Sequence, residues 1–234
     1  MLLVGHQPNY LPYLGFFHKI AQADLFVIVD NVQFVKRGPF GWIHRNRIRT
    51  DGGEGWSWLT VPVLTKGKFE QKIRDVELDP DAPWARKHWK SLEWAYRGAP
   101  HFAWTAERLR PVYERSWKRL AELNEEVIRI LLEAFGIRTP VERAGDRGVE
   151  GKATEYVVSL CRAYGADAYL SGVHGRDYLD PAAFAAAGID LRFQEFAHPV
   201  YPQGRPGPFV ENLSAVDLLF QCGPESRRIL LSEK

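Results

Sequence analysis

The first 34 residues alternate between apolar runs and polar loops in an order typical of a strand, a helix and a second strand. The apolar run Leu2–Val4 leads into the polar loop His6–Tyr10, and apolar positions at helical spacing then cover 14–21. A second apolar run, Leu25–Val29, ends on an Asp-Asn pair. Buried strands joined through a helix are typical of a parallel sheet covered by helices. The opening therefore predicts a βαβ unit.

The pattern changes in the middle of the chain. Two segments of alternating apolar and polar residues, Ser57–Leu64 and Lys72–Leu78, predict a β-hairpin at about 55–80. Helical periodicity follows over about 82–136, with helices expected at 82–96, 105–113 and 116–135. We interpret this middle region as a hairpin and a helical subdomain inserted into the parallel sheet.

The α/β pattern resumes after residue 138. Strands are expected at 139–141, 168–171 and 191–196, and helices at 152–164, 181–187 and 213–220. The strands beginning at Leu2, Leu25 and Ala168 are expected to lie adjacent and parallel. The predicted fold class is α/β, with a doubly wound, mostly parallel sheet, an inserted β-hairpin and a helical subdomain. The length of 234 residues suits a single domain over 1–234.

Composition narrows the function. The formal net charge of +2 argues against bulk electrostatic binding to nucleic acid or to an anionic membrane as the main activity. No apolar run approaches the roughly 18 residues of a membrane span, and no basic region precedes the first apolar residues. We therefore expect a cytoplasmic protein. Two cysteines, Cys161 and Cys222, favour reduced, buried thiols over a disulfide or a zinc cluster.

Polar side chains gather where the predicted strands end. They are His6, Gln7, Asn9, Tyr10, Asp30, Asn31, Ser171, His198, Tyr201 and Gln203. Ligands bind at the carboxyl ends of parallel strands, so we expect these residues to line one crevice. His6, Asp30 and His198 are expected to converge there as catalytic acid and base groups, and the others to contact the substrate. If His6 is the base, activity should fall on the acid side with a pKa typical of histidine.

Each candidate also has a structural interpretation. His6 could bond a backbone carbonyl, Asn9 could form an Asx turn, and Tyr10 could pack in the core. Asp30 could cap a turn, and His198 could belong to a proline-fixed loop over the core. The sequence leaves these alternatives open.

One dense basic segment follows the second predicted strand. Arginines at positions 45, 47 and 49 would share one face of a strand, because strand side chains alternate. Guanidinium groups bind phosphate and diphosphate bidentately. We expect the anionic part of a substrate to be bound by Lys36, Arg37, Arg45, Asn46 and Arg47. The alternative is a solvated edge strand that its charges protect from pairing.

The opening HQPNYLPYLGFFHKIAQAD, followed by a strand ending DNVQF, resembles the start of the WbqC-like family. Later segments resemble it too: RNRI at 45–48, WLTVP at 58–62, YLSG at 169–172, HPVYPQ at 198–203 and NLSAVDLLF at 212–220. Members of this family are found in bacterial O-antigen and other surface-polysaccharide gene clusters. The resemblance implies aminoacyl or acyl transfer to an amino sugar.

We therefore expect an acyl or aminoacyl transferase that modifies an amino sugar or a similar amine in surface-polysaccharide biosynthesis. A thioester of coenzyme A or of carrier-bound phosphopantetheine would serve as the donor, with an acyl carrier protein as a partner. A nucleotide-linked amino sugar would be the acceptor. No spacing of His, Cys and Asp residues indicates a metal site.

Two other classes of function stay open. The segment His6–Asn9, with the later Asn31–Phe34, is weakly similar to pantothenate synthetase, which implies an ATP-dependent amide ligase or nucleotidyltransferase. Asn9 stands where that enzyme has a second histidine, so ATP fits less well. The third class is a non-catalytic sugar- or carrier-binding protein.

Overall fold

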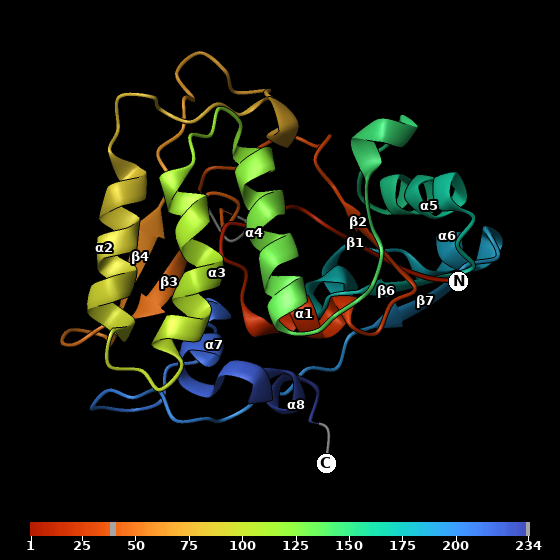
Figure 1. Ribbon diagram of the computed structural model, residues 1–234. Helices are drawn as coiled ribbons and strands as arrows, with labels where there is room; N and C mark the ends of the chain where they lie inside the picture. Colours follow the sequence, from red (N-terminus) through yellow and green to blue (C-terminus); the bar gives the residue numbers. More distant parts are fainter. Residues whose placement is uncertain (38–40, 233–234) are drawn as a thin grey trace. The chain divides into compact units, whose positions relative to one another are not determined.

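A computed structural model describes residues 1–37 and 41–232, and the chain divides into two compact units (Figure 1). Unit 1 consists of Met1–Gln7, Gly15–Val32 and Arg138–Ala197. Unit 2 consists of Pro8–Leu14, Gln33–Ile137 and His198–Lys234. The chain therefore passes repeatedly from one unit to the other. The expectation of one domain over 1–234 stays a prediction.

Unit 1 is built on a five-stranded sheet in which every strand pairs in parallel with its neighbours. The strand order is β5-β2-β1-β6-β7. The strands are β1 (Leu2–His6), β2 (Leu25–Ile28), β5 (Val141–Arg143), β6 (Ala168–Ser171) and β7 (Asp190–Phe193). As predicted, the strands that begin at Leu2, Leu25 and Ala168 are adjacent and parallel, with β1 between the other two.

The order of the strands makes the sheet doubly wound. The chain moves outward from β1 to β2 and β5, then returns to β6 on the other side of β1 and moves outward again to β7. The direction of winding thus reverses between β1 and β6. Such a reversal is a topological switch point, and the ends of the two strands diverge into a crevice there. The predicted fold class is confirmed.

Helices cover both faces of this sheet because successive strand residues point to opposite sides. On one face, Val27 of β2 shares a core with Leu160 of α5 (Ala153–Tyr164). On the other, the neighbouring Phe26 packs against Phe16 of α1 (Leu14–Ile20), with 5.6 Å between ring centroids. The helix α6 (Pro181–Ala186) contributes to the first of these cores.

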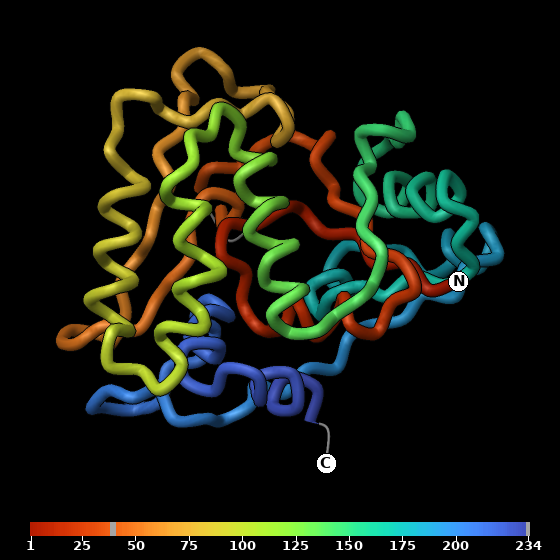
Figure 2. Tube along the Cα trace, in the orientation of Figure 1, coloured from red at the N-terminus to blue at the C-terminus, as the bar shows by residue number. Residues whose placement is uncertain are grey.

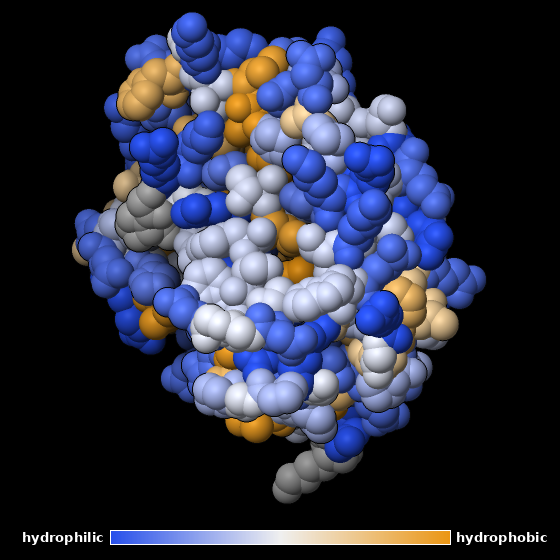
Figure 3. All heavy atoms as spheres, turned by 90° about the vertical axis from the view of Figure 1, so that its left-hand side faces the viewer, coloured by the Kyte–Doolittle hydropathy of each residue, from blue (hydrophilic) through white to orange (hydrophobic). Residues whose placement is uncertain are grey.

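Unit 2 combines a small antiparallel sheet with helices. Three helices lie side by side: α2 (Trp84–Tyr96), α3 (Phe102–Glu114) and α4 (Leu120–Ala134) (Figures 1 and 2). The C-terminal part adds α7 (Val216–Cys222) and α8 (Ser226–Leu231). The helices α2, α3 and α4 lie within 82–136, where helical periodicity was expected, and a separate helical subdomain stays a prediction. Hydrophilic residues cover most of the face that Figure 3 draws.

The hairpin is the main correction to the predicted pairing. The strand β4 (Trp56–Thr60) pairs antiparallel with the preceding β3 (Arg45–Arg49), not with the segment at 72–78. The turn between them contains Gly52, Gly53 and Gly55 with φ of 78°, 54° and 77°, a backbone conformation that favours glycine. The segment at 72–78 forms a 3-10 turn and isolated bridges, of which one joins Val63 to Leu78.

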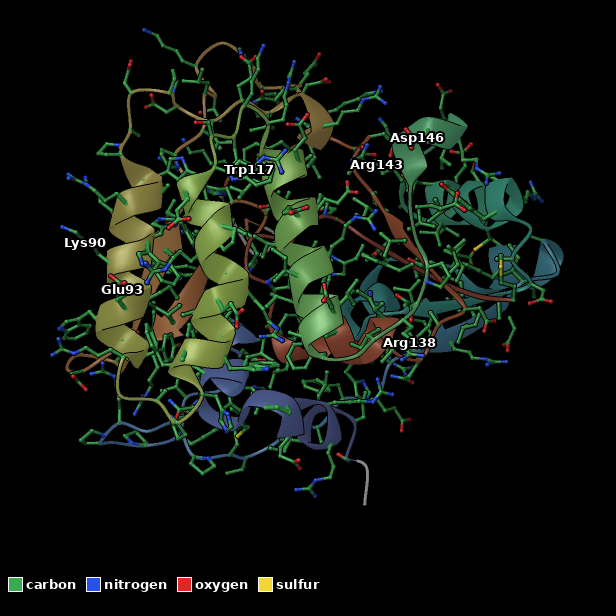
Figure 4. The ribbon with its side chains drawn as sticks, in the orientation of Figure 1. Lys90, Glu93, Trp117, Arg138, Arg143 and Asp146 are labelled. Atoms are coloured by element: carbon green, nitrogen blue, oxygen red, sulfur yellow. The ribbon has the colours of Figure 1, made fainter. Side chains whose placement is uncertain are left out.

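The helix expected at 116–135 begins only at Leu120. The backbone just before this helix pairs with the segment at 77–78. The Leu78 amide donates to the Lys118 carbonyl, and Glu77 forms an isolated β-bridge with Arg119. Trp117, in the connection between α3 and α4 (Figure 4), donates its indole N–H to the Val112 carbonyl at 2.8 Å. These contacts hold 117–119 outside the helix.

Both cysteines are free thiols, with Cys161 buried and Cys222 partly buried. Burial raises the pKa of the Cys161 thiol to about 12 and raises that of Cys222 as well. The expectation of reduced thiols in place of a disulfide agrees with these positions.

No helix in the described ranges 1–37 and 41–232 is long and apolar enough to cross a membrane.

Candidate functional site

Polar residues follow four of the five strands at the carboxyl edge of the sheet in unit 1. His6 ends β1 and Ser171 ends β6, so these two residues flank the switch point. Asp30 comes two residues after β2, and Gln194 comes directly after β7. In open parallel sheets this edge is where ligands bind. We take it as the candidate site.

His6 presents a neutral imidazole at this edge. Its Nδ1 lies 2.8 Å from the Gln7 carbonyl oxygen, which can only accept, so Nδ1 carries the hydrogen and Nε2 is the accepting nitrogen. The ring is partly exposed and packs edge-on against Phe16 at 4.8 Å. Burial, followed by the positive charge of Lys19, lowers the pKa of His6 to about 3. If His6 is the base, the loss of activity caused by its protonation should therefore occur at a pH well below the pKa of an ordinary histidine.

Lys19 is a residue of this site that was not predicted from the sequence. It lies on α1, is only 4% exposed, and its ammonium group forms no hydrogen bond or ion pair within the described parts of the chain. Burial lowers its pKa to about 8. A signal was present: Lys19 comes three residues after Phe16 and next to Ile20, on the apolar side of the helix.

Ser171 and Gly172 form the other side of the switch point. Ser171 is buried, and its hydroxyl donates to the Gly172 carbonyl at 3.1 Å. The short 3-10 turn Val173–Asp177 then passes close to Ser171 Oγ, where Gly175 leaves the room that a side chain would take. The amine of Lys19 lies beside Gly172. Ser171 thus directly precedes the glycine that the Lys19 amine approaches.

Asp30 and Asn31 hold the loops of this edge in place. Asp30 accepts a hydrogen bond from the Gly145 amide at 3.0 Å, in the turn Ala144–Arg147 after β5, where Figure 4 labels Asp146. The Asn31 amide donates to the Val149 carbonyl at 2.7 Å and accepts from the Tyr156 hydroxyl at 2.6 Å. Both the nitrogen and the oxygen of the Asn31 side-chain amide are therefore hydrogen-bonded within unit 1. A catalytic role for Asp30 stays a prediction.

Gln194 was also not predicted. Its amide donates to the Gly15 carbonyl at 2.8 Å and lies 3.0 Å from His18 Nδ1. It therefore links the end of β7 to the start of α1, the helix that carries Lys19.

Several predicted substrate-binding residues lie in unit 2 and have internal partners there. Tyr10 is fully buried, and its hydroxyl lies 2.9 Å from both His88 Nδ1 and the Tyr113 hydroxyl. The Gln203 amide exchanges two hydrogen bonds with the backbone of Val210, at 2.8 and 2.9 Å. These contacts support the structural interpretation of Tyr10 and show that the Gln203 side chain is likewise bonded within the fold.

Asn9, Tyr201 and His198 also belong to unit 2. Asn9 is partly exposed, whereas Tyr201 is buried. His198 lies near Tyr201 and Phe209, with 6.3 and 5.6 Å between ring centroids, and its Nδ1 donates to the Pro199 carbonyl. His6 and Asp30 are in unit 1, so their convergence with His198 stays a prediction.

The predicted basic strand is β3, and two of its arginines pack against tryptophans. The Arg45 guanidinium lies 4.3 Å from the centre of the Trp58 ring, and that of Arg47 lies 4.9 Å from the centre of the Trp56 ring. Both arginines are half-buried on one face of the hairpin. Such stacking fixes the guanidinium groups in place. An anion site on this face stays a prediction.

The other residues of the basic segment differ in their surroundings. Asn46 is buried and donates to the Leu11 carbonyl at 2.6 Å, so it supports the loop. Lys36 is exposed and donates to the Thr65 hydroxyl, and Arg37 is exposed. Of the predicted anion-binding residues, Lys36 and Arg37 are thus the two that are solvent-exposed, as the alternative interpretation expected.

Among the residues that the structure describes, no group of three or more His, Cys, Asp or Glu side chains could hold a metal ion.

Comparison with known proteins identifies the class of protein. Residues 7–229 match the WbqC-like protein family, and the chain belongs to this family. It is similar to the uncharacterized protein Rv1507c of Mycobacterium tuberculosis, with 37% identity over 223 residues that cover 94% of this chain and 93% of that protein. No solved structure matches the chain. The family that the sequence motifs indicated is confirmed.

Proposed function

We propose that this protein is an acyl or aminoacyl transferase that acts on an amino sugar or a similar amine, with its reaction centre at the carboxyl edge of unit 1. The observation that carries the proposal is the switch point between β1 and β6, flanked by a neutral imidazole and a hydroxyl. Membership of the WbqC-like family supports an enzyme of surface-polysaccharide biosynthesis.

In this reaction the amine of the acceptor attacks the carbonyl carbon of a thioester. His6 Nε2 takes the proton that the attacking nitrogen loses, and the Ser171 hydroxyl turns from the Gly172 carbonyl to donate a hydrogen bond to the oxyanion. The carbon–sulfur bond then breaks, the thiolate receives the proton, and the acyl group remains as an amide.

The low pKa of His6 sets a condition on the acceptor. A group with a pKa of about 3 is too weak a base to deprotonate a free ammonium ion. It can take the proton only after attack has made the nitrogen cationic and more acidic. The acceptor amine must therefore bind in its neutral form.

The proposed donor is a thioester of coenzyme A or of carrier-bound phosphopantetheine, which would make an acyl carrier protein a partner. The acceptor would be a nucleotide-linked amino sugar. The stacked arginines of β3 in unit 2, Arg45 and Arg47, have guanidinium forks held in fixed orientations, which suits the binding of a phosphate group.

The test is thiol release from acetyl-coenzyme A and longer acyl thioesters, with a uridine-diphosphate-linked amino sugar as the acceptor. His6→Asn should reduce turnover by about 10²–10⁴-fold, the usual contribution of a positioned acid or base. His174→Asn is the matched control, because that side chain is 82% exposed. Full activity in His6→Asn would show that another group is the base, and no transfer from any thioester would contradict the proposed reaction.

A second candidate function is favoured by the strand order. The central β1, with the chain wound outward on both sides of it, is the arrangement in which nucleotides bind at the switch point. This supports an ATP-dependent amide ligase or nucleotidyltransferase. Release of diphosphate or ADP from magnesium–ATP in the presence of an amine and a free carboxylic acid would select it over the transferase.

A further inference from the structure

We infer that Lys19 and Gly172 form an anion-binding site at the carboxyl edge of unit 1, which receives a carboxylate or phosphate group of the substrate. The inference relies on the location proposed for the active site. It does not rely on the transferase reaction, because the site can be tested by binding alone.

The first observation is the unpaired charge of Lys19. Its side chain is 4% exposed, and in the described residues no carboxylate or carbonyl bonds its ammonium group. Buried charges in proteins are usually paired or hydrogen-bonded, because removing an ion from water is costly. An anionic ligand that binds to Lys19 would explain why the protein has a lysine in this position without a partner of its own.

The second observation is the glycine beside it. Gly172 has φ of −67° and ψ of 165°, which any residue can adopt. A Cβ atom added there would have Lys19 Nζ, at 3.9 Å, as its only neighbour within 4 Å apart from the adjoining residues. Neither the backbone nor the packing therefore requires glycine. The missing side chain instead leaves room next to the ammonium group, as glycine does where a ligand approaches the backbone closely.

The surroundings define the class of ligand. Ser171 precedes Gly172, and His6 lies close enough to Lys19 for the lysine charge to act on its ring. An ammonium group without a protein hydrogen bond suits an oxygen anion, whereas Nε2 of the neutral His6 ring only accepts and does not contact that anion. Carboxylate and phosphate share this chemistry. The two sources, a carboxylic acid substrate and a nucleotide or phosphopantetheine, are separated by the test.

The test is calorimetric titration of the full-length protein with sodium acetate and, separately, with inorganic diphosphate, at constant ionic strength. We expect one of the two anions to bind. Lys19→Met, which has nearly the same length but no charge, should weaken that binding by at least tenfold. Gly172→Ala should weaken it severalfold, because its methyl group occupies the space beside Nζ while the backbone conformation is retained.

Lys90→Met is the control, since Lys90 lies on α2 with an exposed side chain (Figure 4). It should bind the anion as the unmodified protein does. Binding of diphosphate alone identifies a phosphate ligand, and binding of acetate alone a carboxylate. No binding of either anion, or equal affinity in Lys19→Met, would overturn the site. If the protein binds the anion but is inactive with every thioester, the anion site stands and the transferase proposal is wrong.

Discussion

Replacing Lys19 with methionine should stabilise the protein while removing anion binding. The Lys19 side chain is 4% exposed and its ammonium group has no partner in the described structure, so the folded protein bears the cost of its partial desolvation. Methionine has nearly the same length and shape but no charge. A lysine that served only the fold would behave in the opposite way, since its removal would destabilise the protein.

The size of the effect follows from the pKa of Lys19. Burial lowers it from 10.5 to about 8, and each pKa unit corresponds to about 1.4 kcal/mol. The charged form therefore destabilises the folded state by roughly 3 kcal/mol at neutral pH. Between about pH 8 and 10.5 the unfolded state binds more protons than the folded state, so stability rises with pH in this window. Lys19→Met should be more stable at pH 7, and the difference should shrink toward pH 10.5.

The measurement is chemical denaturation of both proteins at several pH values from 7 to 10.5. All eight tryptophans lie between positions 42 and 117, in unit 2, so tryptophan fluorescence does not report on unit 1. Hydrogen exchange of peptides from 2–28, which include β1, α1 and β2, supplies the missing signal. Lys90→Met should change stability by less than about 0.5 kcal/mol. If Lys19→Met is less stable than the unmodified protein, or if the difference in their unfolding free energies does not change with pH, the inference that Lys19 carries an unpaired charge is wrong.

Three further predictions concern the same unit and the thiols. In the folded protein at pH 8, Cys161 should resist iodoacetamide and Cys222 should react first, because burial holds the pKa of Cys161 near 12. Mass spectrometry of the alkylated peptides measures the two rates, and faster modification of Cys161 than of Cys222 would contradict the prediction. Asn31→Ala should cost about 1–3 kcal/mol of folding free energy by leaving the part-buried Val149 carbonyl and the Tyr156 hydroxyl without their partner. A change below 0.5 kcal/mol in denaturant titration would show that this contact is not structural. In a pH–rate profile, kcat/KM should be calculated per concentration of the neutral acceptor amine, which is the form that reacts. It should fall above about pH 8 as Lys19 loses its proton, and it should stay level from pH 7 down to about pH 5 because the pKa of His6 is near 3. A break near pH 6.5 in these corrected values would contradict the low pKa of His6.

Much of unit 1 could be predicted from sequence because its elements are local patterns. The apolar runs beginning at Leu2, Leu25 and Ala168 each form a strand within a few residues of the expected bounds. Their parallel pairing follows from the helices that connect them. The hairpin was mispaired because alternation identifies a strand but not its partner. The glycine-rich turn at 52–55 held the information that favoured the preceding strand.

The candidate site was predicted only in part. The positions of His6 and Ser171 at strand ends follow from the fold, whereas the environment of each side chain depends on residues distant in sequence. Lys19 looks like an ordinary surface lysine until α1 is packed on the sheet, and its neighbour Gly172 is 153 positions away in the chain. The internal partners of Asn31 likewise come from residues more than 100 positions distant.

The most direct test of a substrate site at the carboxyl edge of unit 1 is a crystal structure of the protein with coenzyme A and an amino sugar bound. We predict that an anionic oxygen of one of these molecules lies within hydrogen-bond distance, about 3 Å, of Lys19 Nζ and next to Gly172. His6 Nε2 should face the acceptor amine. A ligand bound in contact with none of His6, Lys19 and Gly172 would contradict the assignment of this edge as the active site.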